Sequence, residues 1–429
     1  MKKRLIGIAR AQPKGKLWKY DPKAETITIP GLRDLHTHPF IYSMMEEART
    51  IDISKCETAD QVKKALEARK GEGVIVADGL KIKITAKELD SISPENHVIV
   101  IDPSYHAGVV NSKTARALKE KARGRNINGT LQPSGKWDEE YLKLCLQVIA
   151  ETLDKDELVS RVVDWVQRQK NNGIVEIHDL DCEGVLGLEV LAAARESWGP
   201  GFPVTKVFAS PDTIAQIPKK LATKLDSYFG GVGVKIYADG SIGSFTAGVE
   251  LQYYGTRNRG KLLCNRRELE GIIRNIRLMD GLVPEIAIHA IGDRGIKFAL
   301  DIASKLNHAV GKQSWIQHYE LSGIERTLLL TKRLFEDGAV AGVVTNPNFV
   351  SDITEYAQRL GNRVDWINPH ARILELGIPL RFGTDGMPQD MVGAVCDAVE
   401  HPVERHRISL DDALKVAGQA DSLKNKITL

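Results

Sequence analysis

The chain has 429 residues, of which 42% are hydrophobic and 27% charged, and its formal net charge is +3. This composition is typical of a soluble globular protein with a large core, and the length fits a barrel of about 250 residues with sizeable additions. Nucleic-acid binding needs clustered Lys and Arg, and so mild an excess gives no support for it. The five cysteines are isolated and form no Cys-x-x-Cys pair, which argues against a disulfide framework and a cysteine zinc site.

The start of the chain is basic, but the apolar run within Met1–Arg10 is too short for a secretory signal. No stretch approaches the roughly 18 consecutive apolar residues that a membrane span needs. We therefore expect a cytoplasmic protein that contacts no membrane.

Residues 1–30 contain short apolar or β-branched segments separated by turns, and they end at Pro30-Gly31. The strands predicted there are Leu5–Ala9, Lys16–Tyr20 and Thr26–Ile29. These segments predict a partial small β-subdomain over residues 1–30.

From residue 31 onward, short apolar segments alternate with longer helical stretches, a pattern typical of parallel strands joined by crossover helices. The eight predicted strands are Arg33–His38, Ile174–His178, Val204–Ala209, Val232–Tyr237, Pro284–His289, Trp315–His318, Val340–Thr345 and Pro379–Thr384. Eight such units predict an α/β fold, a (β/α)8 TIM barrel over residues 31–420. An open doubly wound sheet uses the same units, so the count alone does not establish closure.

The first two barrel strands are separated by far more chain than one helix needs. Residues 40–155 therefore form a long insertion after strand one, with predicted strands of its own at Gly73–Ala77 and His97–Ile101. An insertion at this point follows the carboxyl end of a barrel strand, so we expect it over the barrel mouth.

The strongest local signal is His36-Thr-His38 at the end of the first barrel strand. Side chains two residues apart share one face of a strand, so both imidazoles are expected to point into the barrel. Imidazole is the commonest ligand of zinc-like metals. Alone, such a pair is more often two satisfied polar residues than a metal site.

Four more residues with suitable chemistry lie within, at the end of, or just after other predicted strands. Lys235 lies inside an apolar strand, where a buried ammonium is costly and its pKa falls. A neutral lysine of this kind adds CO2, and the resulting carbamate bridges two cations as a carboxylate does. His289 ends the fifth strand, His318 ends the sixth, and Asp385 follows the eighth.

The order His-x-His, Lys, His, His, Asp on strands one, four, five, six and eight resembles the amidohydrolase superfamily. The motifs at Lys235–Thr246, His289–Arg294, Trp315–His318 and Thr384–Pro388 are similar to the branch that contains N-substituted formamide deformylase. The segments that contain His106 and His178 also resemble that branch. The resemblance extends from about Ile29 to about Ala417.

The resemblance implies a site for two divalent metal ions. His36, His38 and Asp385 would hold the first ion, His289 and His318 the second, and carboxylated Lys235 would bridge them. Nitrogen-rich ligation makes zinc the expected metal, with manganese, iron or nickel as alternatives.

Two cations that share a water lower its pKa toward about 7, so a metal-bridging hydroxide is available at neutral pH. We expect it to attack an amide or formamide carbonyl, with Asp385 passing the proton to the leaving nitrogen. The predicted function is that of a metal-dependent amidohydrolase that cleaves a carbon–nitrogen bond in an amide, an N-substituted formamide or a cyclic amide. Its predicted partner is a small-molecule substrate.

His106 and His178 are candidates for contacting the substrate or the developing oxyanion, although both also fit as ordinary polar residues. Asp239 and Asp293 are expected to organise the site rather than react, and Asp293 fits a helix N-cap.

Members of the resembled family usually carry a small β-sandwich assembled from both chain ends. Here the sequence stops at Leu429, soon after the helical segment Leu410–Val416. We therefore expect the C-terminal strands to be missing and the small subdomain to be reduced to its N-terminal strands. Assembly into a homo-oligomer is compatible with this expectation.

Three alternative functions stay in play. A hydrolytic deaminase of a heterocycle commonly uses one metal and no bridging lysine, so Lys235 favours the two-metal reading. A catalytically silent barrel scaffold usually loses ligands, whereas all six are present here. The same cations would also polarise a phosphoester or a lactone.

Overall fold

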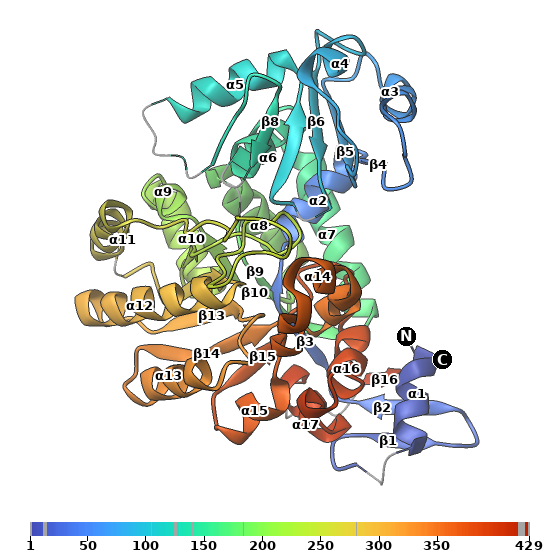
Figure 1. The fold of residues 1–429 in the computed structure, drawn as a ribbon, viewed down its shortest axis with the longest axis vertical. Helices are drawn as coiled ribbons and strands as arrows, with labels where there is room; N and C mark the ends of the chain where they lie inside the picture. The colour runs from blue at the N-terminus through green and yellow to red at the C-terminus, as the bar shows by residue number, and fades with distance from the viewer. Residues whose placement is uncertain are drawn as a thin grey trace. The chain divides into compact units, whose positions relative to one another are not determined.

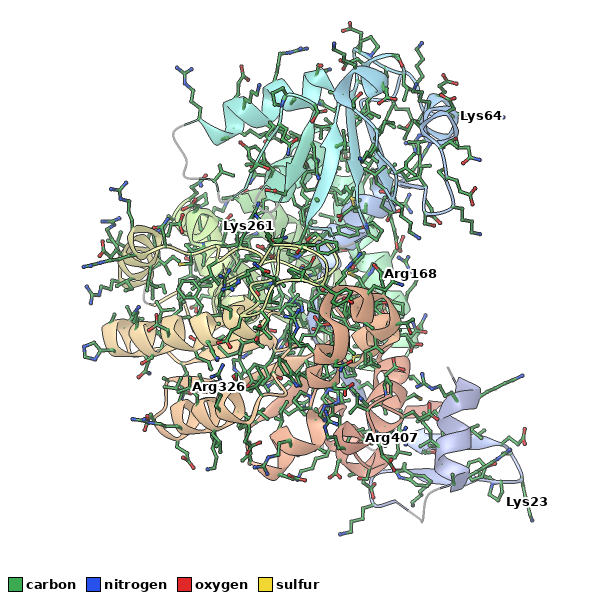
Figure 2. The ribbon with its side chains drawn as sticks, in the orientation of Figure 1. Lys23, Lys64, Arg168, Lys261, Arg326 and Arg407 are labelled. Atoms are coloured by element: carbon green, nitrogen blue, oxygen red, sulfur yellow. The ribbon has the colours of Figure 1, made fainter. Side chains whose placement is uncertain are left out.

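The computed structural model describes most of the chain, and it divides into two compact units (Figure 1). The first unit comprises Met1–His38, Trp165–Cys182 and Arg195–Leu429, and the second comprises Pro39–Asp164 and Glu183–Ala194. The described residues are 2–11, 15–103, 105–123, 127, 129–138, 141–182, 184–279, 281–418 and 425–427. Charged side chains such as Lys23, Lys64 and Arg326 are exposed on the surfaces of these units (Figure 2).

Eight parallel strands form the sheet at the centre of the first unit. Each strand pairs with the barrel strand that comes before it or after it along the chain. In sheet order they are β3 (Leu32–Thr37), β9 (Ile174–Asp179), β10 (Val204–Ala209), β11 (Gly233–Tyr237), β12 (Ile286–Ala290), β13 (Ser314–His318), β14 (Val340–Thr345) and β15 (Leu380–Phe382). Strands such as β12 are buried along their whole length, as expected for a parallel sheet covered on both faces.

The two edge strands of this sheet, β3 and β15, come close together, so the sheet is a nearly closed barrel rather than an open sheet. The amide of Asp385 donates to the carbonyl of His36 at 2.7 Å, and the amide of Thr384 donates to Asp34 Oδ1 at 2.9 Å. These bonds join the chain after β15 to β3. The predicted α/β TIM-type barrel is confirmed.

Helices follow the barrel strands, and one of them begins with a capping box. In α11 (Arg266–Leu278), the Asn265 side chain accepts from the amide of Glu268, whose carboxylate accepts in return from the amide of Asn265. The other helices of this unit are α9 (Pro211–Ile214), α10 (Lys219–Phe229), α12 (Asp293–Val310), α13 (Glu325–Glu336), α14 (Ile353–Leu360), α15 (His370–Glu375), α16 (Met391–Val399) and α17 (Leu410–Ala417), with 3-10 turns η1 (Pro347–Asp352), η2 (Gly361–Trp366) and η3 (Glu404–His406).

The small N-terminal sheet departs from expectation in two respects. The segment Lys2–Ala11 is a helix, α1, so the strand predicted at Leu5–Ala9 is wrong. A short apolar run does not distinguish a strand from one face of a helix, and Leu5, Ile8 and Ala9 are buried at helical spacing.

The second departure concerns the C-terminal strands. Strand β2 (Thr26–Ile29) pairs antiparallel with β1 (Lys19–Asp21) on one side and with β16 (Asn425–Ile427) on the other. The chain does return to this sheet, so the expectation that the small subdomain is reduced to N-terminal strands is wrong.

The second unit is built around a five-stranded mixed sheet. Its strands, in sheet order, are β4 (Ile51–Asp52), β5 (Val74–Asp78), β6 (His97–Ile101), β7 (Ala107–Val110) and β8 (Lys136–Asp138). Its helices are α2 (Pro39–Glu47), α3 (Ala59–Glu67), α4 (Ala86–Asp90), α5 (Ser112–Ala122) and α6 (Tyr141–Glu151), while α7 (Lys155–Asn171) and α8 (Gly184–Trp198) continue into the first unit. A separate apolar core includes Ile75, Val98 and Leu89.

Among the described helices, none combines the length and apolar character needed to cross a membrane.

The seam between β3 and the chain after β15 requires a glycine at position 383. A Cβ there would lie 2.3 Å from His36 Cβ and 2.6 Å from the His36 amide nitrogen. We expect Gly383→Ala to destabilise the fold by about 1–3 kcal/mol through overpacking. Chemical denaturation measures this loss. Gly281→Ala is the control, because a Cβ there meets nothing within 4 Å, and an equal loss in both variants contradicts the seam argument.

Three histidines are buried together beside β14 and β15, outside the barrel mouth. The ring centroids of His370 and His401 lie 6.0 Å apart, and those of His401 and His406 lie 5.2 Å apart. Each ring uses one nitrogen in a hydrogen bond. His370 bonds to Thr345 Oγ1, His401 accepts from the Val403 amide, and His406 bonds to the Asp365 carbonyl. Burial, with the neighbouring His406, lowers the pKa of His401 to about 4.

This cluster predicts an acid-sensitive fold. Because the folded pKa of His401 lies below the ordinary value of about 6.5, the unfolded chain binds the proton more tightly. Unfolding free energy should therefore fall between pH 6.5 and 4, by about 3 kcal/mol for this group. In His401→Asn, which keeps an acceptor for the Val403 amide, metal-free denaturation should show a shallower fall. The exposed His308→Asn should match the parent, and an equally steep fall in His401→Asn would refute the assignment.

Candidate metal centre

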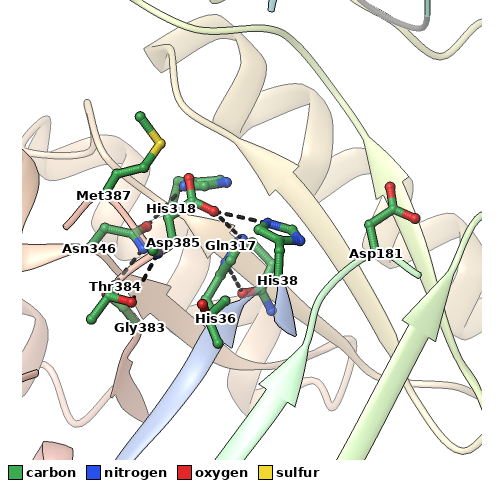
Figure 3. A network of polar contacts seen from close by, with 12 residues as sticks. His36, His38, Asp181, Gln317, His318, Asn346, Gly383, Thr384, Asp385 and Met387 are labelled. Carbon is green, nitrogen blue, oxygen red and sulfur yellow. Dashed lines mark hydrogen bonds and ion pairs between the residues drawn. The ribbon is translucent and has the colours of Figure 1, made fainter. Parts of the chain in front are cut away.

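Three predicted ligands meet at the seam of the barrel (Figure 3). Asp385 Oδ1 lies 3.0 Å from His38 Nε2 and 3.4 Å from His36 Nε2. Within the described residues, this is the one group of three His, Cys, Asp or Glu side chains whose ligand atoms all lie within 4.8 Å of one another. His36 and His38 come from the end of β3, and Asp385 comes from the loop after β15.

The other three predicted ligands adjoin this group. Lys235 Nζ, on β11, lies 3.5 Å from His36 Nε2, and the lysine is only 1% exposed. The ring of His318 lies 4.4 Å from that of His36 and 4.4 Å from that of His289, centroid to centroid. The structure therefore brings together all six side chains, which come from five strands or from the loops that follow them.

Two of these residues have unusual backbone conformations. His318 has φ of 63° and Asp385 has φ of 56°, in the left-handed region that non-glycine residues rarely adopt. Such conformations persist where the surrounding structure enforces them, and they concentrate at functional sites. At Asp385 the enforcing contact is the hydrogen bond from its backbone N–H to the His36 carbonyl. The same hydrogen bond connects the chain after β15 to β3.

Neighbouring polar groups orient three of the imidazoles. Gln317 Oε1 lies 2.8 Å from His36 Nδ1, Asn346 Oδ1 lies 2.9 Å from His318 Nδ1, and the Gly240 carbonyl lies 3.1 Å from His289 Nε2. A proton on each of these nitrogens leaves the opposite ring nitrogen as the lone-pair donor. For His36 that donor is Nε2, the atom that faces Asp385 and Lys235.

The chemistry of this donor set fits divalent metal ions. Burial, together with the charge of Lys235, holds the pKa of His36 well below its ordinary value, so the imidazole is in the neutral form that a metal requires. His38 Nδ1 is buried and has no hydrogen-bond partner among the described residues. Neutral nitrogen donors beside a carboxylate are typical of zinc-like sites.

Asp34 fastens the loop that carries Asp385. Its carboxylate accepts from Thr384 Oγ1 at 2.6 Å and from Gln389 Nε2 at 2.8 Å, besides the Thr384 amide. Burial raises the pKa of Asp34 to about 6, against the lowering effect of the Thr384 bonds. The fully buried acid thus connects β3 to the segment after β15 by three bonds.

His178 and His106 lie outside this group. Among the described residues, His178 Nε2 pairs with Glu176 Oε1 at 3.1 Å, and Lys206 and Glu285 also act on its pKa. Glu176 is thus the observed partner of His178, and the predicted substrate contact of His178 stays a prediction. His106 belongs to the second unit, where it is half-buried just before β7.

Asp239 and Asp293 have the organising positions expected of them. Asp239 accepts from the backbone amides of Ile291, Gly292 and Gly248, so it holds the loop after β12. Asp293 is the first residue of α12, and Gly292 is the N-cap, so the predicted capping position is wrong by one residue. Asp293 instead accepts from the Glu250 amide at 3.0 Å.

Sequence reasoning missed the residues that support the ligands, namely Asp34, Gln317 and Asn346. A signal existed for two of them. Asp34 alternates with His36 and His38 on one face of β3, and Gln317 immediately precedes His318. Asn346 follows β14, one of the three barrel strands to which no ligand had been assigned, so nothing in the sequence singled it out.

Comparisons with known proteins show the family and the fold of this chain. The pattern that defines the Amidohydrolase family matches residues 25–398. An uncharacterized metal-dependent hydrolase from Pyrococcus furiosus is similar in structure, with 22% identity, a TM-score of 0.65, and coverage of 90% of this chain and 80% of its own. One from Pyrococcus horikoshii OT3 has 23% identity, a TM-score of 0.65, and coverage of 90% and 79%, respectively. No match was found among curated proteins.

The bond from Gln317 to His36 gives a test of the site. We expect Gln317→Ala to weaken divalent metal binding by about 10–100-fold, because the orienting partner of a ligating histidine is lost. Competition against a chromogenic chelator measures the change. Gln313→Ala, at an exposed position four residues earlier, should bind metal as the parent does. Equal affinities for parent and Gln317→Ala would contradict the proposed orienting role of Gln317.

Proposed function

Since the chain belongs to the Amidohydrolase family, we propose that this hydrolase cleaves a carbon–nitrogen bond of an amide, an N-substituted formamide or a cyclic amide, using two divalent metal ions. One observation carries the proposal: six side chains of ligand chemistry from five barrel strands meet at one end of the barrel. The motifs that resemble formamide deformylases support a formamide as the first substrate class to test.

The proposed ligand assignment follows the contacts. His36, His38 and Asp385 would hold the first ion, and His289 and His318 the second. Lys235, beside His36, would bridge them as a carbamate, formed when its neutral amine adds CO2 and releases a proton. Zinc is the proposed metal because four of the six ligands are imidazoles.

Bound ions of this kind polarise a carbonyl oxygen and make a nearby water more acidic. Asp385 would accept the proton of the attacking water on a carboxylate oxygen and deliver it to the departing nitrogen. His36 and Asp385 are held by the Gln317 and seam contacts, so the proton acceptor does not need to reorganise during the reaction. His106, in the second unit, and His178, on β9, stay predicted substrate contacts.

The decisive experiment is a hydrolysis screen of zinc-reconstituted protein against N-formyl amines, N-acyl amino acids and cyclic amides. Asp385→Asn should lower kcat/KM by about 10²–10⁴-fold, because the proton carrier is lost. Asp301→Asn, at an exposed position on α12, is the matched control and should keep parental activity. Hydrolysis that is equally fast in Asp385→Asn and Asp301→Asn contradicts the proposed role, and an inert parent contradicts the proposed function.

Metal stoichiometry tests the bridging lysine separately. Elemental analysis of the parent should give two ions per chain, and loading in CO2-depleted buffer should be incomplete until bicarbonate is added. Lys235→Ala should lose this bicarbonate response. One ion per chain in the parent, unaffected by bicarbonate, would contradict the two-metal site and favour a deaminase.

A further inference from the structure

A buried carboxylate lies next to the candidate metal centre and is not used by it. Glu320 follows β13 two residues after His318 and is 1% exposed. Both of its carboxylate oxygens are buried and have no hydrogen-bond partner among the described residues. Burial of a carboxylate without a partner is unfavourable, and a cation that pairs with it would offset that cost.

The charged groups that act on Glu320 are all acidic. They are Asp352, Asp239 and Asp385. Asp239 is already satisfied by three backbone amides, and Asp385 belongs to the candidate ligand group. Asp352, at the end of η1, is therefore the acid that shares the surroundings of Glu320.

The two arginines of the neighbouring segment are committed elsewhere. Arg363 donates to the backbone carbonyls of Leu360, Leu251 and Gln252. Arg359 pairs with Glu355 and lies over the Phe245 ring. Among the described residues, no basic side chain contributes to the electrostatic environment of Glu320.

Aromatic rings complete the surroundings. The charge of Glu320 contributes to raising the pKa of both Tyr356, on α14, and Tyr253, after burial as the main cause. Both rings belong to the apolar cluster that contains Leu321, the residue after Glu320. A carboxylate near aromatic rings is a favourable environment for an organic cation, which can form an ion pair and cation–π contacts there.

We propose that Glu320 is the counter-ion for a cationic group of the substrate, an ammonium or a guanidinium, bound beside the metal centre. Asp352 adds negative charge to the same place, and Tyr356 contributes its ring. The inference rests on the proposed function and narrows it, because the amides cleaved would be those that carry a basic group.

Three formamides of equal chain length isolate the charge. They are the mono-N-formyl derivatives of 1,5-diaminopentane, pentylamine and 6-aminohexanoate, whose far ends are cationic, neutral and anionic. The zinc-loaded parent should prefer the cationic over the neutral compound by at least about tenfold in kcat/KM, and the anionic compound should be poorest. In Glu320→Gln the cationic-to-neutral ratio should fall to about one, a comparison within one variant that does not depend on its active fraction.

Matched variants identify the residue responsible. Glu325→Gln removes an exposed carboxylate on α13 and should keep the parental ratio. Asp352→Asn should reduce the ratio less than Glu320→Gln does, and it tests the same charge if Glu320→Gln does not fold. A parent that hydrolyses the three compounds without favouring the cationic one overturns the inference and leaves the proposed function standing.

A binding measurement separates the two ideas. Pentylammonium should raise the Tm of the parent and not that of Glu320→Gln, and pentan-1-ol should act equally on both. If the parent cleaves none of the formamides but shows this difference, the substrate pocket stands and the proposed reaction fails. If elemental analysis finds a further metal ion that Glu320→Gln loses, Glu320 binds an inorganic cation and the inference is overturned.

Discussion

The bonds across the seam between β3 and the chain after β15 are the contacts on which the rest of the structure depends. The Asp385 amide bonds to the His36 carbonyl, and Asp34 bonds to the Thr384 amide and hydroxyl. The same bonds close the barrel and place the Asp385 carboxylate against the imidazoles of β3. Closure of the barrel and assembly of the site therefore depend on the same hydrogen bonds.

The candidate ligands and Glu320 have contrasting electrostatic surroundings. His36 is held neutral by burial and by Lys235, while amide oxygens of Gln317 and Asn346 orient His36 and His318. On the other side, Glu320 is buried among carboxylates with no hydrogen-bond partner in the described chain. Neutral donors suit metal ions, and in our proposal Glu320 pairs with an organic cation of the substrate.

Backbone strain and close packing occur at the candidate metal ligands and at the residues beside them. His318 and Asp385 adopt left-handed backbone conformations, and Gly383 packs so closely on His36 that any Cβ would clash. A fold tolerates such positions only where neighbouring contacts enforce them. Here those neighbours are the seam and the strands that carry the candidate ligands, which gives the strain a position consistent with function.

The sequence by itself determined the eight barrel strands and the six candidate ligands, because strand periodicity and the chemistry of His-x-His, a buried lysine and an aspartate are local properties. It did not determine that Leu5–Ala9 is helical, since a short apolar run suits either state, nor that β16 returns to β2, since that pairing joins opposite ends of the chain. Only the tertiary structure assigned His178 to Glu176, recruited Asn346, and left Glu320 without a partner. Those outcomes depend on which side chains long-range packing brings together, and no local pattern encodes that.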